Sequence, residues 1–242
     1  MGQKIFKTDT QRADKYKTIE NIINAFIGKE YLFRSRSLDL GCATGYGSAH
    51  FAHVCKWIVG LDVDYDYLQL AHSRYDEANL CWICQDCIQP PFYSNTFDLV
   101  IYNGMIMYAQ DPRRILLEIQ RVLKSEGYCY ISSTNRYRII ARSMYYTPYW
   151  IYWFPKFLYK LYRKMAKNYF PMPAYYFPLS WKELMDVCGQ FEIHDITFEV
   201  ISHNENYGIT IPKIIKLLPL FLLKRILIFS SVFILLLRKK GD

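Results

Sequence analysis

The stretch Leu38–Gly47, which reads LDLGCATGYG, decides the fold of this chain. It continues an apolar run that begins at Ser37, and its three glycines fall within seven positions. An apolar run that ends in a glycine-rich turn is typical of a strand that leads into a helix. In such a turn the backbone amides can approach a ligand closely. We therefore expect a ligand site at the end of this first strand.

The spacing of the glycines excludes two common phosphate-binding turns. A dinucleotide-binding turn needs a third glycine at the position where His50 stands. A Walker-type phosphate loop ends in Lys followed by Ser or Thr, and this turn has no such ending. What remains is an acidic residue, Asp39, two positions before the pattern G-x-x-x-G-x-G.

Further short apolar runs follow the first one, and the segments between them are long enough to form helices. The runs read SLDL, WIVGLD, LCWIC, FDLVIY and YCYIS, within residues 37–132. Apolar strands that alternate with helices favour a parallel, doubly wound α/β sheet that is covered on both faces. Helical periodicity or start signals predict helices at Tyr16–Lys29, Asp111–Leu123 and Trp181–Cys188. The alternating run at residues 191–200 predicts a strand of an antiparallel pair.

The turn and the segments after it resemble the class I S-adenosylmethionine-dependent methyltransferases. The order and spacing agree over residues 37–135, from the motif at Asp39–Gly47 to the fourth strand, helix and fifth strand at Phe97–Ser132. The resemblance implies a Rossmann-like methyltransferase fold with a mostly parallel seven-stranded sheet. It also implies S-adenosylmethionine as the cofactor and methyl transfer as the reaction.

The resemblance further implies which residues hold the cofactor. Asp62, at the end of the second strand, would accept hydrogen bonds from both ribose hydroxyls, and Asp86 would hold the adenine amino group. Asp39 would anchor the ammonium side, directly or through water. Ala43 stands where glycine is usual, so we expect it to keep a negative φ. The predicted cofactor-binding residues are Asp39, Gly41, Cys42, Ala43, Gly45, Asp62, Val63, Asp86, Cys87, Asn103 and Gly104.

Two assignments in this site stay open at the level of the sequence. Asp64 follows Asp62 by two positions, so a shift of the strand by two residues would bring Asp64 to the ribose. Tyr108 lies where related proteins carry a histidine, and it is the candidate catalytic residue. It would either orient an acceptor hydroxyl or form a wall of the pocket, because a phenol is a poor base at neutral pH. Positioning alone supplies much of the acceleration in an in-line methyl transfer.

The cysteines do not predict a metal site. In the run Cys81, Cys84 and Cys87, a ferredoxin-type cluster would need a fourth cysteine where Pro91 stands, and zinc would need a second pair. We expect Cys81 and Cys84 to pack as small apolar groups in the third strand. Seven cysteines, with no signal-peptide pattern after Met1, predict free thiols in a reducing compartment.

The net charge of +8 is concentrated in two stretches of the chain. Residues 127–182 contain nine basic residues and no acidic one, and residues 206–242 contain seven basic residues and one acidic residue. Residues 144–178 also hold 15 of the 42 aromatic side chains. Tyr and Trp mixed with Lys and Arg suit the headgroup layer of a bilayer better than a nucleic-acid surface. We therefore expect a membrane surface as a partner, and no nucleic acid.

Two segments carry these membrane features. Residues 156–167 place cations at helical spacing with apolar residues between them, which predicts a basic amphipathic helix in the membrane interface. The alternative is a helix of a substrate domain whose aromatic residues are core. The apolar runs Leu217–Leu223 and Ile226–Leu237 are each too short to span a bilayer. They predict two in-plane or re-entrant helices or, alternatively, a dimer interface.

The sequence thus predicts a methyltransferase core at residues 1–135, an aromatic and basic insertion at 136–178, the end of the core at 179–211 and a hydrophobic membrane-associating tail at 212–242. We expect a cytoplasmic enzyme at the inner face of a membrane. It would methylate a lipid-linked sugar, a quinone precursor or a lipid, with oxygen as the preferred acceptor atom. The alternatives are a soluble methyltransferase of small molecules with the insertion as a lid, and a non-catalytic membrane adaptor. The oligomeric state stays undecided.

Overall fold

The computed structural model describes residues 9–138, 149–166, 175–202 and 232–241. Within these ranges one sheet has seven strands in the order β3-β2-β1-β4-β5-β7-β6. Strands β1 to β5 pair in parallel, and β7 runs antiparallel between β5 and β6. The predicted doubly wound sheet is confirmed. Its strands are β1 (Arg36–Leu40), β2 (Trp57–Asp62), β3 (Leu80–Cys84), β4 (Phe97–Asn103), β5 (Leu123–Thr134), β6 (Glu192–Asp195) and β7 (Val232–Arg238).

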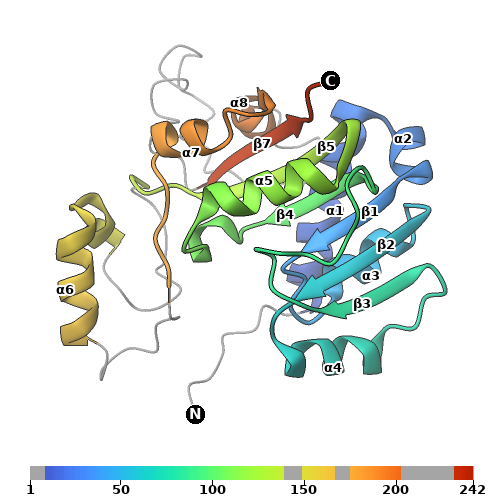
Figure 1. Ribbon diagram of the computed structural model, residues 1–242, viewed down its shortest axis with the longest axis horizontal. Coiled ribbons are helices and arrows are strands. Elements are labelled where there is room, and N and C mark those ends of the chain that lie inside the picture. Colours follow the sequence, from blue (N-terminus) through green and yellow to red (C-terminus); the bar gives the residue numbers. More distant parts are fainter. Residues whose placement is uncertain (1–8, 139–148, 167–174, 203–231, 242) are drawn as a thin grey trace.

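Helices cover both faces of the sheet (Figure 1). One face carries α1 (Asp9–Ile27), α2 (Lys29–Arg34), α3 (Tyr46–Ala52) and α8 (Thr197–Ser202). The opposite face carries α5 (Pro112–Val122) and α7 (Trp181–Val187). Helix α4 (Tyr65–Arg74) contacts β2 and β3. The 3-10 helix η1 (Ile106–Tyr108) follows β4, and the insertion contains η2 (Tyr149–Trp153) and α6 (Lys156–Ala166).

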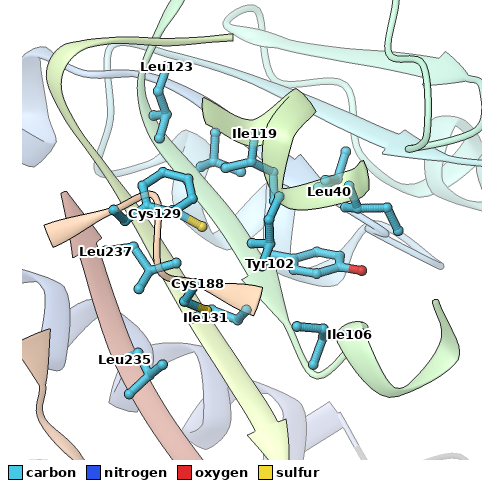
Figure 2. Close-up of a cluster of buried hydrophobic side chains, with 14 of the residues drawn as sticks. Leu40, Tyr102, Ile106, Ile119, Leu123, Cys129, Ile131, Cys188, Leu235 and Leu237 are labelled. Atoms are coloured by element: carbon cyan, nitrogen blue, oxygen red, sulfur yellow. The ribbon is translucent and has the colours of Figure 1, made fainter. Parts of the chain in front are cut away.

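The alternation of side chains along the strands divides the core into two layers. In β4, Leu99 belongs to the layer under α1 and α3, whereas Val100 belongs to the layer under α5 and α7. In β7, Leu236 belongs to the layer under α1 and α3, and Leu235 belongs to the layer under α5 and α7. Figure 2 shows the second layer, where Ile119 of α5 lies among side chains from β4, β5 and β7. Because both faces are covered, these strands are apolar throughout, as the sequence analysis expected.

Two helix starts show how local sequence determines the element boundaries. The predicted N-cap Asp111 is confirmed, because its Oδ1 accepts a hydrogen bond of 3.2 Å from the backbone N–H of Arg114, with Pro112 at the first helical position. Helix α7 begins with a capping box, in which Ser180 and Glu183 each accept a hydrogen bond from the other's backbone N–H.

The run at residues 191–200 is a strand over only part of its length. Glu192–Asp195 forms β6 and pairs antiparallel with β7, but Thr197 already begins α8. The side chain of Asp195 accepts a hydrogen bond of 3.0 Å from the backbone N–H of Thr197. This local turn ends the strand, so the prediction of one strand over the whole run is wrong in its second half.

Strand β7 also corrects the prediction of a membrane-associating tail at residues 212–242. Val232–Arg238 is a strand inside the sheet, and both Leu235 and Leu237 are fully buried. A continuous apolar run fits a strand covered on both faces as well as it fits an apolar helix, so the hydropathy pattern alone misleads. The prediction is wrong for Val232–Arg238, and residues 212–231 lie outside the described residues.

The basic end of this segment contacts protein groups. Arg238 forms ion pairs with Glu126 and Glu192. The Lys239 ammonium donates hydrogen bonds of 2.7 Å to Asn95 Oδ1 and to the carbonyl oxygen of Leu123. Both side chains are therefore held by groups of the protein.

The insertion contains the helix that its periodicity predicts. Helix α6 spans Lys156–Ala166, and in Figure 1 it stands at one side of the molecule, away from the helices that cover the sheet. Residues 139–148 and 167–174 of the insertion lie outside the described residues. Across the described ranges, no helix is long and apolar enough to cross a membrane.

The burial of β7 yields a test of stability. We expect Leu235→Ala to lower the free energy of unfolding by about 2–5 kcal/mol, because a fully buried side chain leaves a cavity when it is truncated. Leu117→Ala, on the exposed side of α5, is the control and should change it by less than about 0.5 kcal/mol. Urea unfolding followed by circular dichroism measures both variants. Equal losses at the two positions would contradict the placement of β7 in the sheet.

Candidate functional site

The glycine-rich turn after β1 is fastened to the neighbouring strand. The backbone N–H groups of Gly41 and Cys42 both donate to the carbonyl oxygen of Leu61 in β2, at 2.8 and 3.1 Å. Gly41 has a φ of +82°, and a Cβ atom there would lie 2.7 Å from Cγ of Met105. Glycine is thus required at this position both by the left-handed backbone and by the close approach of a side chain.

The backbone at Ala43 differs from the expectation. Its φ is +48°, whereas the sequence analysis expected a negative value. The left-handed conformation costs an L-residue about 1–2 kcal/mol. The N–H of Ala43 donates a hydrogen bond of 2.7 Å to Oδ2 of Asp62, and a bond to a charged group contributes about 1.5–3 kcal/mol. This bond is sufficient to hold Ala43 in its strained conformation.

Asp62, and not Asp64, is the acidic residue that faces the site. Asp62 ends β2, is nearly buried and accepts a second hydrogen bond, of 3.0 Å, from the N–H of Asp64 to its Oδ1. Asp64 is instead the N-cap of α4, since its carboxylate accepts from the N–H of Tyr67 at 3.2 Å. The alternative register, which would exchange the two residues, is not found.

A cavity of about 350 Å³ opens at the carboxyl ends of β1, β2, β3 and β4. Of the predicted cofactor-binding residues, those that line it are Gly41, Asp62, Val63, Asp86 and Cys87, and the candidate catalytic residue Tyr108 lines it as well. The rest of the wall was not predicted from the sequence, and it consists of Leu61, Gln85, Ile88, Tyr102, Met105, Ala109, Gln110 and Ile115. Most of these are apolar residues in or after a strand, and their local sequence carries no further signal.

The other predicted residues lie around the cavity without lining it. Asn103 ends β4, and its Oδ1 accepts a hydrogen bond of 2.7 Å from the hydroxyl of Ser132. The N–H of Gly104 donates to the carbonyl oxygen of Ser132 at 3.1 Å. This pair holds the end of β4 against β5. The remaining members of this group are Asp39, Cys42, Ala43 and Gly45 in and before the glycine-rich turn.

Asp39 is a buried carboxylate beneath that turn. Its Oδ2 accepts a hydrogen bond of 2.7 Å from the hydroxyl of Ser48 in α3. Burial raises the pKa of Asp39 to about 6, although Ser48 and the nearby Lys15 act in the opposite direction. Burial disfavours the ionised form, so a cation placed next to this carboxylate would be favourable.

Tyr16 is a neighbour of the site that the sequence analysis missed. It comes from α1, and a Cβ atom at Gly47 would lie 2.4 Å from its Cε1. Burial and Asp39 raise the pKa of Tyr16, whereas an interaction with Asn103 lowers it. Tyr16 thus brings α1 against the ends of β1 and β4. Its position on the same helix face as Ile19 is the only sequence signal for this contact.

Tyr108 connects the cavity to the insertion. Its ring centroid lies 5.2 Å from that of Tyr176, and the N–H of Phe177 donates a hydrogen bond of 2.8 Å to the carbonyl oxygen of Met107. These residues belong to a small second core, here called the aromatic cluster. Its members are Met107, Tyr108, Ile151, Tyr152, Tyr159, Tyr162, Tyr175, Tyr176 and Phe177. The insertion is therefore attached directly to one wall of the cavity.

The cysteine run does not form a ligand set in the described part of the chain. No group of three or more His, Cys, Asp or Glu side chains there could hold a metal ion. Cys81 and Cys84 are exposed on β3, so the expectation that they pack as small apolar groups is wrong. The reason is that β3 is an edge strand of the sheet.

Comparison with known proteins identifies the domain that contains this site. Residues 38–131 match a protein family described as "Methyltransferase domain". The ubiquinone biosynthesis O-methyltransferase of Glaesserella parasuis is 27% identical over 112 residues, which cover 43% of this chain and 48% of that protein. A probable S-adenosylmethionine-dependent methyltransferase of Mycobacterium tuberculosis is 31% identical over 101 residues, covering 41% and 35% of the two chains. This chain thus spans less than half the length of these curated relatives.

A solved structure shows the same fold over nearly the whole chain. The PH0226 protein of Pyrococcus horikoshii has a TM-score of 0.61 at 16% identity, covering 96% of this chain and 93% of that one. Taken together, the family match and the curated relatives show that residues 38–131 are similar to the methyltransferase domain of S-adenosylmethionine-dependent enzymes, and these residues include the glycine-rich turn after β1 and Asp62 at the end of β2.

Proposed function

We propose that this chain transfers a methyl group from S-adenosylmethionine to a membrane-associated acceptor, at the cytoplasmic face of a membrane. The acceptor classes are a lipid-linked sugar, a quinone precursor or a lipid, and oxygen is the preferred acceptor atom. The observation that carries the proposal is the cavity at the carboxyl ends of β1 to β4. It has the Asp62 carboxylate in one wall and Tyr108 of the aromatic cluster in another.

The cavity suits the nucleoside of the cofactor in size and chemistry. Its volume of about 350 Å³ lies within the usual range of small-molecule sites. Each oxygen of Asp62 accepts one backbone hydrogen bond, and a carboxylate offers about four acceptor positions in all. Two positions are therefore left for the ribose hydroxyls. The carboxylate of Asp86, oriented by a bond of 2.9 Å from the N–H of Ile88, is the group for the adenine amine.

Asp39 suits the ammonium end of the cofactor. A buried carboxylate with a raised pKa gains most from a neighbouring cation, and Asp39 stands two residues before Gly41, which lines the cavity. When bound, S-adenosylmethionine supplies an activated methyl group on a cationic sulfur. The protein's own contribution is to position the acceptor next to it and to exclude water. Tyr108 is placed to orient an acceptor hydroxyl, because it lies in both the cavity wall and the aromatic cluster.

The nature of the acceptor is supported by the insertion and by the names of the relatives. The insertion joins the cavity wall to the aromatic and basic helix α6, as expected for an acceptor that arrives from a membrane. One relative is named as a ubiquinone biosynthesis O-methyltransferase and another as a ubiquinone/menaquinone biosynthesis C-methyltransferase. A third is named as a malonyl-acyl-carrier-protein O-methyltransferase. That name favours the alternative in which the acceptor is not a lipid and the insertion serves as a lid.

The titration of Asp39 yields a prediction for stability. Its pKa of about 6 in the folded chain lies above the value of about 3.9 for an unfolded aspartate. The folded state therefore binds the proton more tightly, and the resulting stabilisation is complete below about pH 4 and is lost as the pH rises to about 6. Asp39→Asn should abolish this loss, so that at pH 7 the variant is more stable than the wild type by up to about 3 kcal/mol. Its affinity for S-adenosylmethionine should fall.

Urea unfolding at several pH values between 4 and 8, together with calorimetric titration of the cofactor, measures both effects. The quantity to compare is the difference between variant and wild type, because other groups titrate in the same range. A difference that does not change between pH 4 and pH 7 would contradict the role of Asp39 as a buried carboxylate whose pKa is raised on folding.

The proposed activity is tested by transfer of a labelled methyl group. Wild-type protein, membrane lipid extract and S-adenosylmethionine with a tritiated methyl group should give labelled lipid. Asp62→Asn should weaken cofactor binding about 10- to 100-fold, because charged hydrogen bonds to the ribose are lost. Asp66→Asn makes the same charge change at an exposed position and should bind as the wild type does. Label that enters only water-soluble molecules would favour the alternative, and unchanged binding by Asp62→Asn would contradict the site.

A further inference from the structure

Five large apolar side chains of η2, α6 and the link between them are exposed. Their exposed fractions run from 44% at Trp153 to 71% at Met165. Three of them recur every four residues along α6, so they form one line on the helix surface. We call these five residues the apolar stripe, and they are Trp153, Phe154, Phe157, Leu161 and Met165.

Exposed apolar residues elsewhere are scattered, which is ordinary for a protein surface. In the rest of the described chain, the large ones come from α2, α4, α5 and two connecting segments. They are Phe33, Val63, Tyr65, Tyr93 and Leu117. Among the described residues, exposed large apolar side chains are therefore concentrated in the apolar stripe, and three of its five members lie on α6.

The opposite side of α6 is occupied by the aromatic cluster. Tyr159 lies two residues from both Phe157 and Leu161, which places it on the far side of the helix. It is 96% buried, and its ring centroid lies 5.0 Å from that of Tyr152 and 5.5 Å from that of Phe177. Helix α6 thus attaches to the protein by one face and leaves the apolar stripe on the other.

Cations flank the apolar stripe. Lys160 and Lys164 are exposed, and each stands one residue before a member of the stripe. No acidic residue occurs between Gly127 and Lys182. A lysine next to an anionic bilayer contributes about 1 kcal/mol of attraction, and its aliphatic chain can lie along apolar surface. This charge pattern is complementary to an anionic surface.

We propose that the apolar stripe docks on an anionic lipid bilayer, with α6 lying in the plane of the membrane interface. This inference rests on the proposed function, because it names the surface that brings a lipid-borne acceptor to the cavity. Helix α6 has 11 residues, far fewer than the ~20 needed to span a bilayer, so a position in the interface is the geometry open to it.

The aromatic cluster gives the docking a direct connection to the chemistry. Tyr159 of α6 contacts Tyr152, whose ring centroid lies 5.5 Å from that of Tyr176, and Tyr176 contacts Tyr108 in the cavity wall. Helix α6 and the aromatic cluster therefore link a bilayer in contact with the apolar stripe to the wall of the cavity that Tyr108 forms.

Flotation of the full-length chain with lipid vesicles tests the proposal. One set of vesicles is phosphatidylcholine alone, and the other contains phosphatidylglycerol in addition. The wild type should float with the anionic vesicles and not with the neutral ones. Leu161→Glu should lower the vesicle-bound fraction about tenfold or more, because it places an anion within the apolar stripe. Leu117→Glu is the matched control, since both leucines are 55% exposed on helices, and it should float as the wild type does.

Three outcomes would overturn the proposal. In the first, the wild type floats with neither kind of vesicle. In the second, it floats equally with both, and in the third, Leu161→Glu floats as well as the wild type does. Light scattering measures whether the apolar stripe instead binds a second copy of the chain. A wild-type dimer that Leu161→Glu converts to a monomer, without any flotation, would assign the apolar stripe to self-association.

Calorimetric titration of the same variants with S-adenosylmethionine separates this proposal from the proposed function. Leu161→Glu should keep the cofactor affinity of the wild type, which also shows that it is folded. Intact cofactor binding and methyl transfer without flotation would reject the docking alone. Flotation without cofactor binding would reject the proposed function and leave the docking in place.

Discussion

The hydrogen bond from the backbone of Ala43 to the carboxylate of Asp62 is the constraint on which the site depends. At 2.7 Å it joins the turn after β1 to the end of β2 and holds Ala43 at a positive φ. Two further bonds, from Gly41 and Cys42 to Leu61, fasten the same turn. Asp62 thereby has two tasks, because the carboxylate that shapes the turn is also the one that faces the cavity. This arrangement explains why an acidic residue at the end of β2 and a glycine-rich turn after β1 occur together.

Much of the fold could be predicted because its signals are local. Apolar runs covered on both faces, a capped α5 and a glycine turn each lie within about ten residues of sequence, so pattern and propensity are sufficient to place them. The same holds for the residues of the cavity that follow strands, such as Asp62 and Asp86. Their position at the end of a parallel strand follows from the strand itself.

The parts that could not be predicted depend on contacts between distant segments. Tyr16 reaches the site because α1 packs against α3, and the helical periodicity of α1 shows only that Tyr16 and Ile19 share a face, not which element that face contacts. Strand β7 has the hydropathy of a membrane segment, and only its pairing with β5 and β6 distinguishes the two. The exposure of Cys81 follows from the position of β3 at the edge of the sheet. In each case burial is a property of the whole fold and not of the segment.

The insertion adds a second core to this conventional sheet, and its aromatic side chains connect α6 to Tyr108. The central claim remains the placement of the cofactor, which a crystal structure with S-adenosylhomocysteine tests most directly. We expect the ribose hydroxyls within hydrogen-bond distance of the Asp62 carboxylate, the adenine amine facing Asp86, and the amino-acid end over Asp39. A nucleoside bound elsewhere, with Asp62 bonded only to the backbone of Ala43 and Asp64, would contradict it.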